Sequence, residues 1–176
     1  GALGALSEVW GELSQAAGAA ERLTELQAEE PQVRAPASPV ALPEPAKGAV
    51  EFRDVSFAYP MRPDRAALDR LSFAVKPGET VAIVGPSGSG KSTVFSLLLR
   101  FYDPQGGAVL VDGVDVRQAD PQAVRGRMAI VPQDVTIVAA SAADNIAFGR
   151  PGAGEAEIRA AARDARADEF ISRLDK

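Results

Sequence analysis

The spacing of apolar residues predicts an N-terminal helix, a proline-rich segment and then a region of strands and helices. Residues 1–29 place apolar side chains at alternating steps of three and four, which is one helical stripe. The stripe comprises Leu3, Leu6, Trp10, Leu13, Ala17 and Ala20, and Leu23 and Leu26 continue it with a slip in phase. The simplest interpretation is an amphipathic helix that packs on another surface. Residues 30–48 contain five prolines, which fix φ and remove backbone donors, so an extended linker is predicted.

From residue 49 onward the pattern predicts an α/β domain. A first strand over residues 50–59 alternates with period two, and a phase slip at Arg53–Asp54 predicts a bulge or kink. A second alternating strand is centred on residues 71–75. Residues 80–84 form a continuous apolar run, which is typical of a strand buried on both faces.

Turn and cap signals define the rest of this region. Asp112-Gly113 is a strong hairpin signal between two apolar runs, and Asp120-Pro121 combines a helix cap with a proline at the first helical position. The predicted elements are a helix over 91–101, a hairpin over 107–116, a short helix from Asp120, a buried strand over 128–131, a helix over 141–147 capped by Ser141, a helix over 155–166, and a last turn capped by Asp168.

The amino-acid composition and net charge argue against several classes of function. The chain of 176 residues is 46% apolar, which is enough for a core, and its net charge of −5 argues against a nucleic-acid platform. It has no cysteine and no histidine, so thiolate or imidazole chemistry is excluded for these residues. We expect the chain by itself to be soluble, because it lacks both a long apolar run and a signal-peptide pattern.

Residues 85–93 carry the strongest chemical signal. Their sequence, Gly-Pro-Ser-Gly-Ser-Gly-Lys-Ser-Thr, matches the phosphate-loop pattern in full, between a predicted strand and a predicted helix. Glycines let the backbone turn its N–H groups inward, and a helix N-terminus attracts negative charge. The alternative is a chance match in a glycine-rich turn, which this context disfavours. The expected ATP-binding residues are Gly85, Pro86, Ser87, Gly88, Ser89, Gly90, Lys91 on the β- and γ-phosphates, Ser92 on Mg²⁺, and Thr93 near the α-phosphate.

Tyr59 and Gln133 become candidate functional residues only when they are considered together with that loop. Taken alone, Tyr59 is an ordinary strand aromatic and Gln133 a solvated side chain after a strand.

Five further segments match one family pattern. They are Val-Glu-Phe-Arg-Asp-Val-Ser-Phe-Ala-Tyr-Pro at 50–60, Lys-Pro-Gly-Glu-Thr-Val-Ala-Ile-Val-Gly at 76–85, Leu-Leu-Arg-Phe-Tyr-Asp-Pro at 98–104, Val-Pro-Gln-Asp at 131–134 and Asp-Asn-Ile-Ala-Phe-Gly at 144–149. With the phosphate loop, they resemble the nucleotide-binding domain of exporter-type ABC transporters. Residues 1–29 also resemble the cytoplasmic end of the last transmembrane helix of such exporters, with 30–48 as linker and 49–176 as the N-terminal part of the domain.

The resemblance implies a fold and a set of roles. The fold is an incomplete P-loop NTPase, with a RecA-like core and an antiparallel β subdomain, preceded by the N-terminal helix. Tyr59 would stack on the adenine, and Ser92 and Gln133 would complete the Mg²⁺ shell. Lys91 and Gln133 would act in catalysis, and Gln133 would also sense the transmembrane domain.

Two departures from the family pattern change what is expected. Residues 136–140 lack the aromatic residue often found where the domain meets the coupling helices. The Leu-Ser-Gly-Gly-Gln signature, the strand ending in Asp-Glu and the switch histidine do not occur in the sequence. We therefore expect a fragment truncated before those motifs, which binds Mg-ATP without hydrolysing it efficiently.

The expected partners follow from the resemblance: the transmembrane domain of the same transporter and a second nucleotide-binding domain, identical or not, with no nucleic acid. The parent would lie in a membrane, with this part on the cytoplasmic face, and a bacterial inner membrane is expected. A soluble ABC ATPase and a non-enzymatic interaction fragment are the alternatives.

Overall fold

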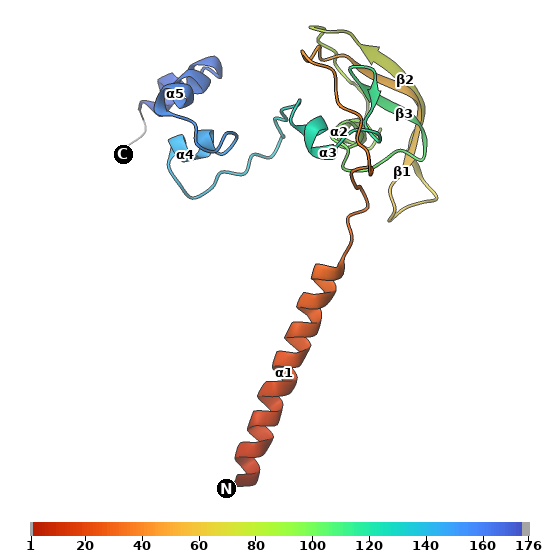
Figure 1. Ribbon diagram of the computed structural model, residues 1–176. Helices are drawn as coiled ribbons and strands as arrows, with labels where there is room; N and C mark the ends of the chain where they lie inside the picture. Colours follow the sequence, from red (N-terminus) through yellow and green to blue (C-terminus); the bar gives the residue numbers. More distant parts are fainter. Residues whose placement is uncertain (1, 174–176) are drawn as a thin grey trace. The chain divides into compact units, whose positions relative to one another are not determined.

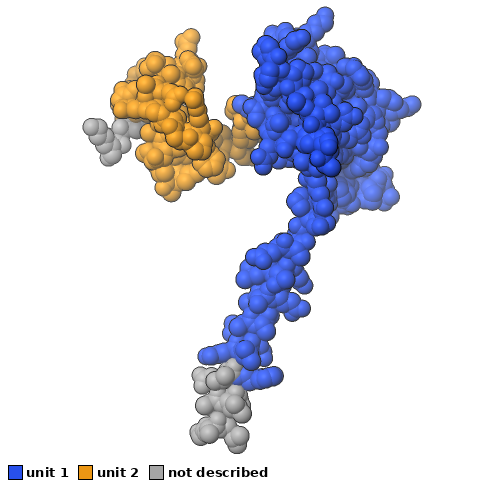
Figure 2. Space-filling model, viewed as in Figure 1, with its two compact units in different colours: residues 1–129 blue, residues 130–176 orange. Residues whose placement is uncertain are grey.

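A computed structural model describes residues 2–173, with side chains described from Trp10 onward. These residues fall into two compact units that divide between Ala129 and Ile130 (Figure 2). Among the described residues, the first unit holds an antiparallel sheet with helices, and the second holds helices alone (Figure 1). The α/β class and the antiparallel sheet agree with the expected fold. No described helix has both the length and the apolar character that crossing a bilayer requires.

Helix α1 (Ala2–Ala28) covers almost all of the N-terminal helix predicted over residues 1–29. Its side chains from Trp10 to the helix end are exposed, and Leu13, Leu23 and Leu26 each expose more than half of their area. The side chains of Leu3 and Leu6, also in the predicted stripe, lie outside the described set. The stripe thus forms a helix, and its described apolar side chains face solvent.

The sheet of the first unit has four antiparallel strands in the order β2-β1-β3-β4. They are β1 (Val50–Ala58), β2 (Ala66–Val75), β3 (Gly106–Val111) and β4 (Val114–Asp115). The central strand β1 buries Phe52, Val55 and Phe57, and the phase change between Phe52 and Val55 puts all three on the core side. Its pairing with β2 shifts in register at that point, and Asp54 has a φ of 50°. The predicted bulge at Arg53–Asp54 is therefore confirmed.

The core of this unit lies between the sheet and two helices, α2 (Lys91–Leu98) and α3 (Pro121–Arg125). Leu97 and Val124 come from the helices and are fully buried, as are Val55 and Val109 of the sheet. Helix α2 ends three residues before the predicted boundary, because Arg100 adopts a left-handed φ of 51°. Helix α3 begins as predicted, with the Asp120 carboxylate accepting from the Gln122 N–H at 2.6 Å.

Two predicted strands are wrong. Residues 80–84 and 128–131 form no strand, and neither is hydrogen-bonded to a strand among the described residues. A strand exists only through pairing, and parallel strands need neighbours that are distant in sequence. Val84 and Val131 are 85% and 92% exposed. The parallel sheet of the expected RecA-like core is thus not formed by these residues.

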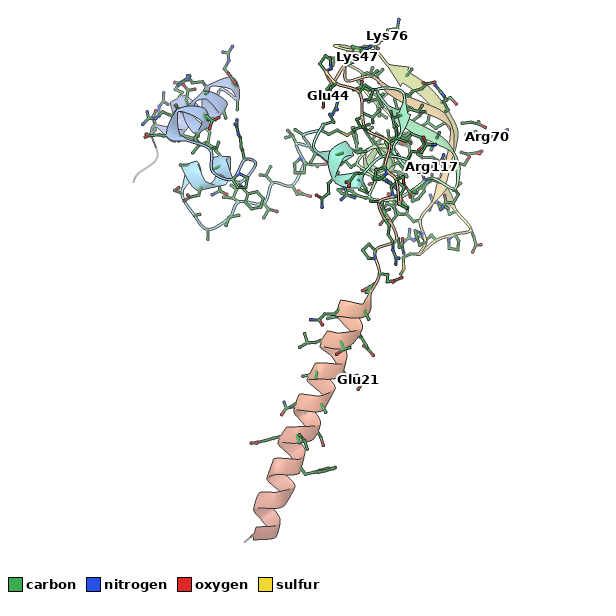
Figure 3. The ribbon with its side chains drawn as sticks, viewed as in Figure 1. Glu21, Glu44, Lys47, Arg70, Lys76 and Arg117 are labelled. Atoms are coloured by element: carbon green, nitrogen blue, oxygen red, sulfur yellow. The ribbon has the colours of Figure 1, made fainter. Side chains whose placement is uncertain are left out.

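The proline-rich segment is extended but lies against the first unit. Leu42 is buried in the core, and the Val40 N–H donates to the Gln118 carbonyl at 2.8 Å. The Arg127 guanidinium donates to the Pro43 carbonyl at 2.9 Å and to Glu44 at 2.7 Å (Figure 3 labels Glu44). Segment 30–48 is therefore docked, which the prolines alone did not predict.

The second unit contains α4 (Ala142–Ala147), α5 (Glu155–Asp164) and α6 (Asp168–Ile171). Ser141 caps α4 as predicted, and its hydroxyl and backbone N–H both donate to Asp144, which lowers the pKa of that carboxyl. Helix α5 ends two residues before the predicted boundary. The predicted cap at Asp168 is wrong, because Asp168 is already helical and Ala167 takes the cap position.

Candidate nucleotide-binding site

The phosphate-loop segment, residues 85–93, leads directly into α2. Gly90 caps the helix with a φ of 88°, a left-handed conformation that favours glycine. A Cβ at Gly90 would lie 2.5 Å from the Ala67 carbonyl oxygen and 2.8 Å from a Leu68 methyl. The loop can therefore approach β2 closely only because this position has no side chain.

The Lys91 side chain lies across the loop. Its ammonium donates to the carbonyl oxygens of Gly85 at 2.8 Å and Pro86 at 2.7 Å. These contacts place a positive charge beside the helix N-terminus, where the first N–H groups have no acceptor inside the helix. Residues 85–89 are exposed, so the charge and these donors face an accessible surface.

The hydroxyl groups that follow Lys91 differ in exposure. Ser92 is exposed, whereas Thr93 is 4% exposed. No three acidic side chains in the described part of the chain converge to hold a metal. Hydroxyl and phosphate oxygens are ligand types that Mg²⁺ accepts. The exposed Ser92 hydroxyl is suited to that role.

Tyr59 follows the last residue of β1 and contacts the loop helix. Its hydroxyl lies 3.1 Å from the Thr93 hydroxyl. Its ring packs edge-to-face on Phe57 and on Tyr102, with centroids 5.0 and 5.3 Å apart. Tyr59 and Tyr102 also line a cavity of about 740 Å³, whose other lining comes from residues 60–62 and from 26 and 29–32, and which none of residues 85–93 lines. The first unit thus brings the predicted adenine residue next to the predicted phosphate residues.

Gln133 belongs to the second unit, where it is exposed in the irregular segment before α4. Its predicted contacts with Mg²⁺ and phosphate stay predictions. The neighbouring side chains Val135, Ile137 and Val138 are exposed. An apolar exposed segment is suited to a protein contact, although it lacks the aromatic residue of the family pattern.

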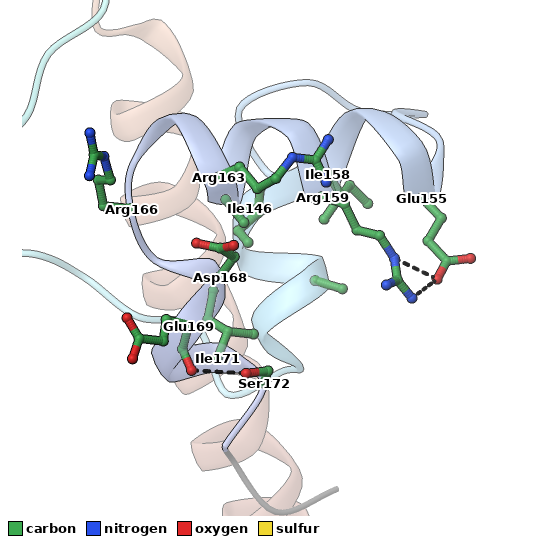
Figure 4. Close-up of a pocket in the computed structure, with 12 residues that line it drawn as sticks. Ile146, Glu155, Ile158, Arg159, Arg163, Arg166, Asp168, Glu169, Ile171 and Ser172 are labelled. Atoms are coloured by element: carbon green, nitrogen blue, oxygen red, sulfur yellow. Dashed lines mark hydrogen bonds and ion pairs between the residues drawn. The ribbon is translucent and has the colours of Figure 1, made fainter.

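The second unit has a larger cavity, about 1200 Å³, between α4, α5 and α6 (Figure 4). Ile146, Ile158 and Ile171 line it, and an ion pair between Arg159 and Glu155 lies at its rim. Glu169 also lines it. The phosphate-loop sequence lies in the other unit. We therefore place the candidate site at Tyr59 and residues 85–93.

The structure adds Tyr102 to the residues that the sequence indicates. Tyr102 lies 43 positions from Tyr59 in the sequence, and no local pattern connects the two rings.

Comparison with known proteins gives consistent matches. Residues 68–176 match the family described as ABC transporter. The mouse protein "ATP-binding cassette sub-family B member 10, mitochondrial" is 41% identical over 172 residues, covering 96% of this chain and 24% of that protein. The Rhizobium etli protein "Beta-(1-->2)glucan export ATP-binding/permease protein NdvA" is 50% identical over 125 residues, covering 71% of this chain and 21% of that protein.

A solved structure gives the same result. The structure described as that of a bacterial Atm1-family ABC exporter with ATP bound has a TM-score of 0.79 and 41% identity. The match covers 88% of this chain and 26% of that one. The chain therefore spans about a quarter or less of the proteins to which it is similar.

Proposed function

This chain belongs to the ABC transporter family, and from that premise we propose that it is the ATP-binding part of an exporter. The function would be to couple ATP binding and hydrolysis to transport across a membrane. The observation that carries the proposal is the loop at residues 85–93, which opens α2 beside Tyr59. A loop of this sequence alone would support only nucleotide binding. The family supports a transporter, and the names of the similar proteins support an exporter.

The phosphate-binding role rests on charge and donors. The Lys91 ammonium now donates to two loop carbonyls, so a phosphate oxygen would compete for the same N–H donors. The backbone donors of the first turn of α2 and the helix dipole would add to the attraction. The Ser92 hydroxyl would hold Mg²⁺, and Gln133 is proposed as a further ligand.

The partners and location are proposed from the relatives. The Rhizobium protein is named an export ATP-binding/permease protein, and the solved structure is described as an exporter with ATP bound. We accordingly propose a transmembrane domain of the same transporter and a second nucleotide-binding domain as partners. The site would lie on the cytoplasmic face, and a bacterial inner membrane is the proposed location.

Residues 1–176 alone are proposed to bind Mg-ATP but to hydrolyse it poorly. These residues include no Leu-Ser-Gly-Gly-Gln signature, no apolar strand ending in Asp-Glu and no histidine. A carboxylate general base typically contributes ~10²–10⁴-fold to a rate. Robust steady-state hydrolysis by the pure chain would contradict this part of the proposal.

Calorimetric titration of Mg-ATP into the 176-residue chain tests the binding. Lys91→Ala is expected to weaken binding by about 10–100-fold, since a hydrogen bond to a charged group contributes ~1.5–3 kcal/mol. Lys76→Ala is the matched control, because Lys76 is exposed and lies outside the loop. Equal affinity in wild type and Lys91→Ala would reject the phosphate-loop assignment. Absence of binding in a folded wild-type chain would favour a non-enzymatic interaction role.

A further inference from the structure

We infer that Tyr102 is a positioning residue for nucleotide-base recognition, which holds the Tyr59 ring ready before a base arrives. The inference rests on the proposed ATP-binding function and goes beyond it, because it concerns a residue outside the loop and outside the base contact itself. The observation behind it is a cluster of three aromatic rings at the end of β1.

The three rings are mutually in contact. Tyr59 is edge-to-face with Phe57 and with Tyr102, and Phe57 lies 5.4 Å from Tyr102 between centroids. Phe57 is buried, at 2% exposure, so it anchors the cluster to the core. Edge-to-face pairs have a preferred geometry, so two of them on one ring restrict its orientation.

Tyr59 needs such support because it lies one residue beyond the end of β1. Its neighbour Ala58 is held by the Gln105 side chain, which accepts from the Ala58 N–H at 2.8 Å and donates to the Ala58 carbonyl at 2.9 Å. Segment 102–105 therefore supports Tyr59 through both its ring and its adjacent backbone.

Segment 102–105 is itself firmly attached to the core. Arg100, two residues before Tyr102, is 3% exposed and donates to the Ala119 carbonyl at 2.7 Å and to Asp103 at 3.0 Å. Pro104 is buried. Tyr102 is thus a fixed support, whereas Tyr59 lies on a strand end that leads into an exposed turn.

The opposite end of Tyr59 contacts the loop helix, through the hydroxyl pair with Thr93. The ring therefore bridges segment 102–105 and α2. Stacking on a base needs a ring face in a set orientation, and a ring fixed in advance loses less freedom on binding. Removing Tyr102 should reduce affinity for the base without changing the phosphate contacts.

The test compares Mg-ATP with magnesium tripolyphosphate, which has the phosphates but no base. Tyr102→Ala is expected to weaken Mg-ATP binding by about 3–10-fold, in line with the range for aromatic pairs, and to leave tripolyphosphate binding unchanged. Tyr102→Phe keeps the ring and should bind both as wild type does. Tyr59→Ala removes the stacking ring itself, so its selective loss of Mg-ATP affinity should equal or exceed that of Tyr102→Ala. The double variant should bind Mg-ATP about as weakly as Tyr59→Ala.

Three outcomes would overturn the inference: unchanged Mg-ATP affinity in Tyr102→Ala, equal loss of both ligands, or additive losses in the double variant. If wild type binds neither ligand, the proposed function itself fails. If wild type binds both and Tyr102→Ala binds both equally well, only the role of Tyr102 fails.

A second measurement applies even if Tyr102→Ala does not fold. The chain has only two tyrosines, so Tyr102→Phe leaves Tyr59 as the single tyrosine. In a tyrosine-labelled NMR sample, its ring signals should shift more with Mg-ATP, which has a base, than with tripolyphosphate. In Tyr102→Leu, the ring of Tyr59 should flip faster than in Tyr102→Phe. Equal flip rates would reject a positioning role.

Discussion

The sheet of the first unit and the apolar runs at 80–84 and 128–131 are both rich in residues that favour strands, yet only the sheet is paired. In the sheet, β1 and β2 are joined by a turn of seven residues, 59–65, and β3 and β4 by the two-residue turn Asp112-Gly113. The central strand β1 also pairs with β3, across the 47 residues from 59 to 105. Each run has an apolar composition but pairs with no strand among the described residues. Pairing, rather than apolar content, thus separates the two regions.

The difference shows what each region contributes to the site. The paired sheet fixes Tyr59 at the end of β1, and the close approach of Gly90 to β2 fixes the loop helix beside it. Run 80–84 leads into the loop, but its side chains, Ile83 apart, are exposed. The sheet therefore positions Tyr59, the proposed base-binding residue. Three sets of substitutions test how far stability follows the pairing.

The largest expected effect is at Gly107 in β3. It has a φ of 74°, and an added Cβ would collide with the carbonyl groups of Arg53 and Asp54 at the bulge. Gly107→Ala should lower the free energy of unfolding by about 2–4 kcal/mol, because steric collision adds to backbone strain. Denaturant unfolding followed by circular dichroism measures this, since the single tryptophan, Trp10, lies in exposed α1 and not in the sheet.

Gly113→Ala is the matched control. Gly113 has a φ of 85°, but an added Cβ there would meet nothing within 4 Å. Gly113→Ala should lower the free energy of unfolding by only about 1–2 kcal/mol, which is the strain of an alanine in the left-handed conformation. If both variants cost the same, close packing at the bulge does not contribute and the sheet is looser than its geometry indicates.

The bulge also illustrates what the sequence predicts well. A phase slip at Arg53–Asp54, the Asp112-Gly113 turn and the caps at Asp120 and Ser141 are encoded within a few residues, and all four are confirmed. For the candidate site, neighbouring residues in the sequence likewise indicate the phosphate loop and Tyr59 as candidates. Their contact through Thr93, and the support from Tyr102, join residues 34 or more positions apart, so no local pattern could predict them. The error at 80–84 has the same cause, since pairing is not a local property.

An intermediate effect is expected at Asp112, in the turn between β3 and β4. Burial raises the pKa of this carboxyl, but hydrogen bonds from the backbone N–H groups of Ala49 and Lys47 and the charge of Arg127 outweigh it, so the pKa is lowered. A carboxyl with a lowered pKa in the folded state adds stability above its unfolded pKa, here 3.8, and that stability is lost as the pH falls through the folded value.

Asp112→Asn tests this contribution, since asparagine tolerates the φ of 50° at this position. The variant replaces one carboxylate oxygen, which accepts a hydrogen bond, with an amide NH₂ group, which is a donor facing a backbone N–H. Asp112→Asn should lower the free energy of unfolding by about 1–3 kcal/mol at pH 7, and this difference from wild type should become smaller below about pH 4. Unfolding of both proteins between pH 7 and pH 3 gives the comparison. A difference that does not change with pH would mean that the charge of Asp112 does not stabilise the docked segment 47–49.

The smallest effect is expected in the unpaired runs. Val84 and Val131 are 85% and 92% exposed, so truncation to alanine removes few contacts and should change the free energy of unfolding by no more than about 0.5 kcal/mol. Val109→Ala is the matched substitution in the sheet, where the same side chain is fully buried and its loss should cost about 1–3 kcal/mol. The contrast isolates pairing and burial, because the residue change is the same at all three positions. If Val84→Ala or Val131→Ala costs as much as Val109→Ala, the runs are packed in solution and the distinction between the two regions fails.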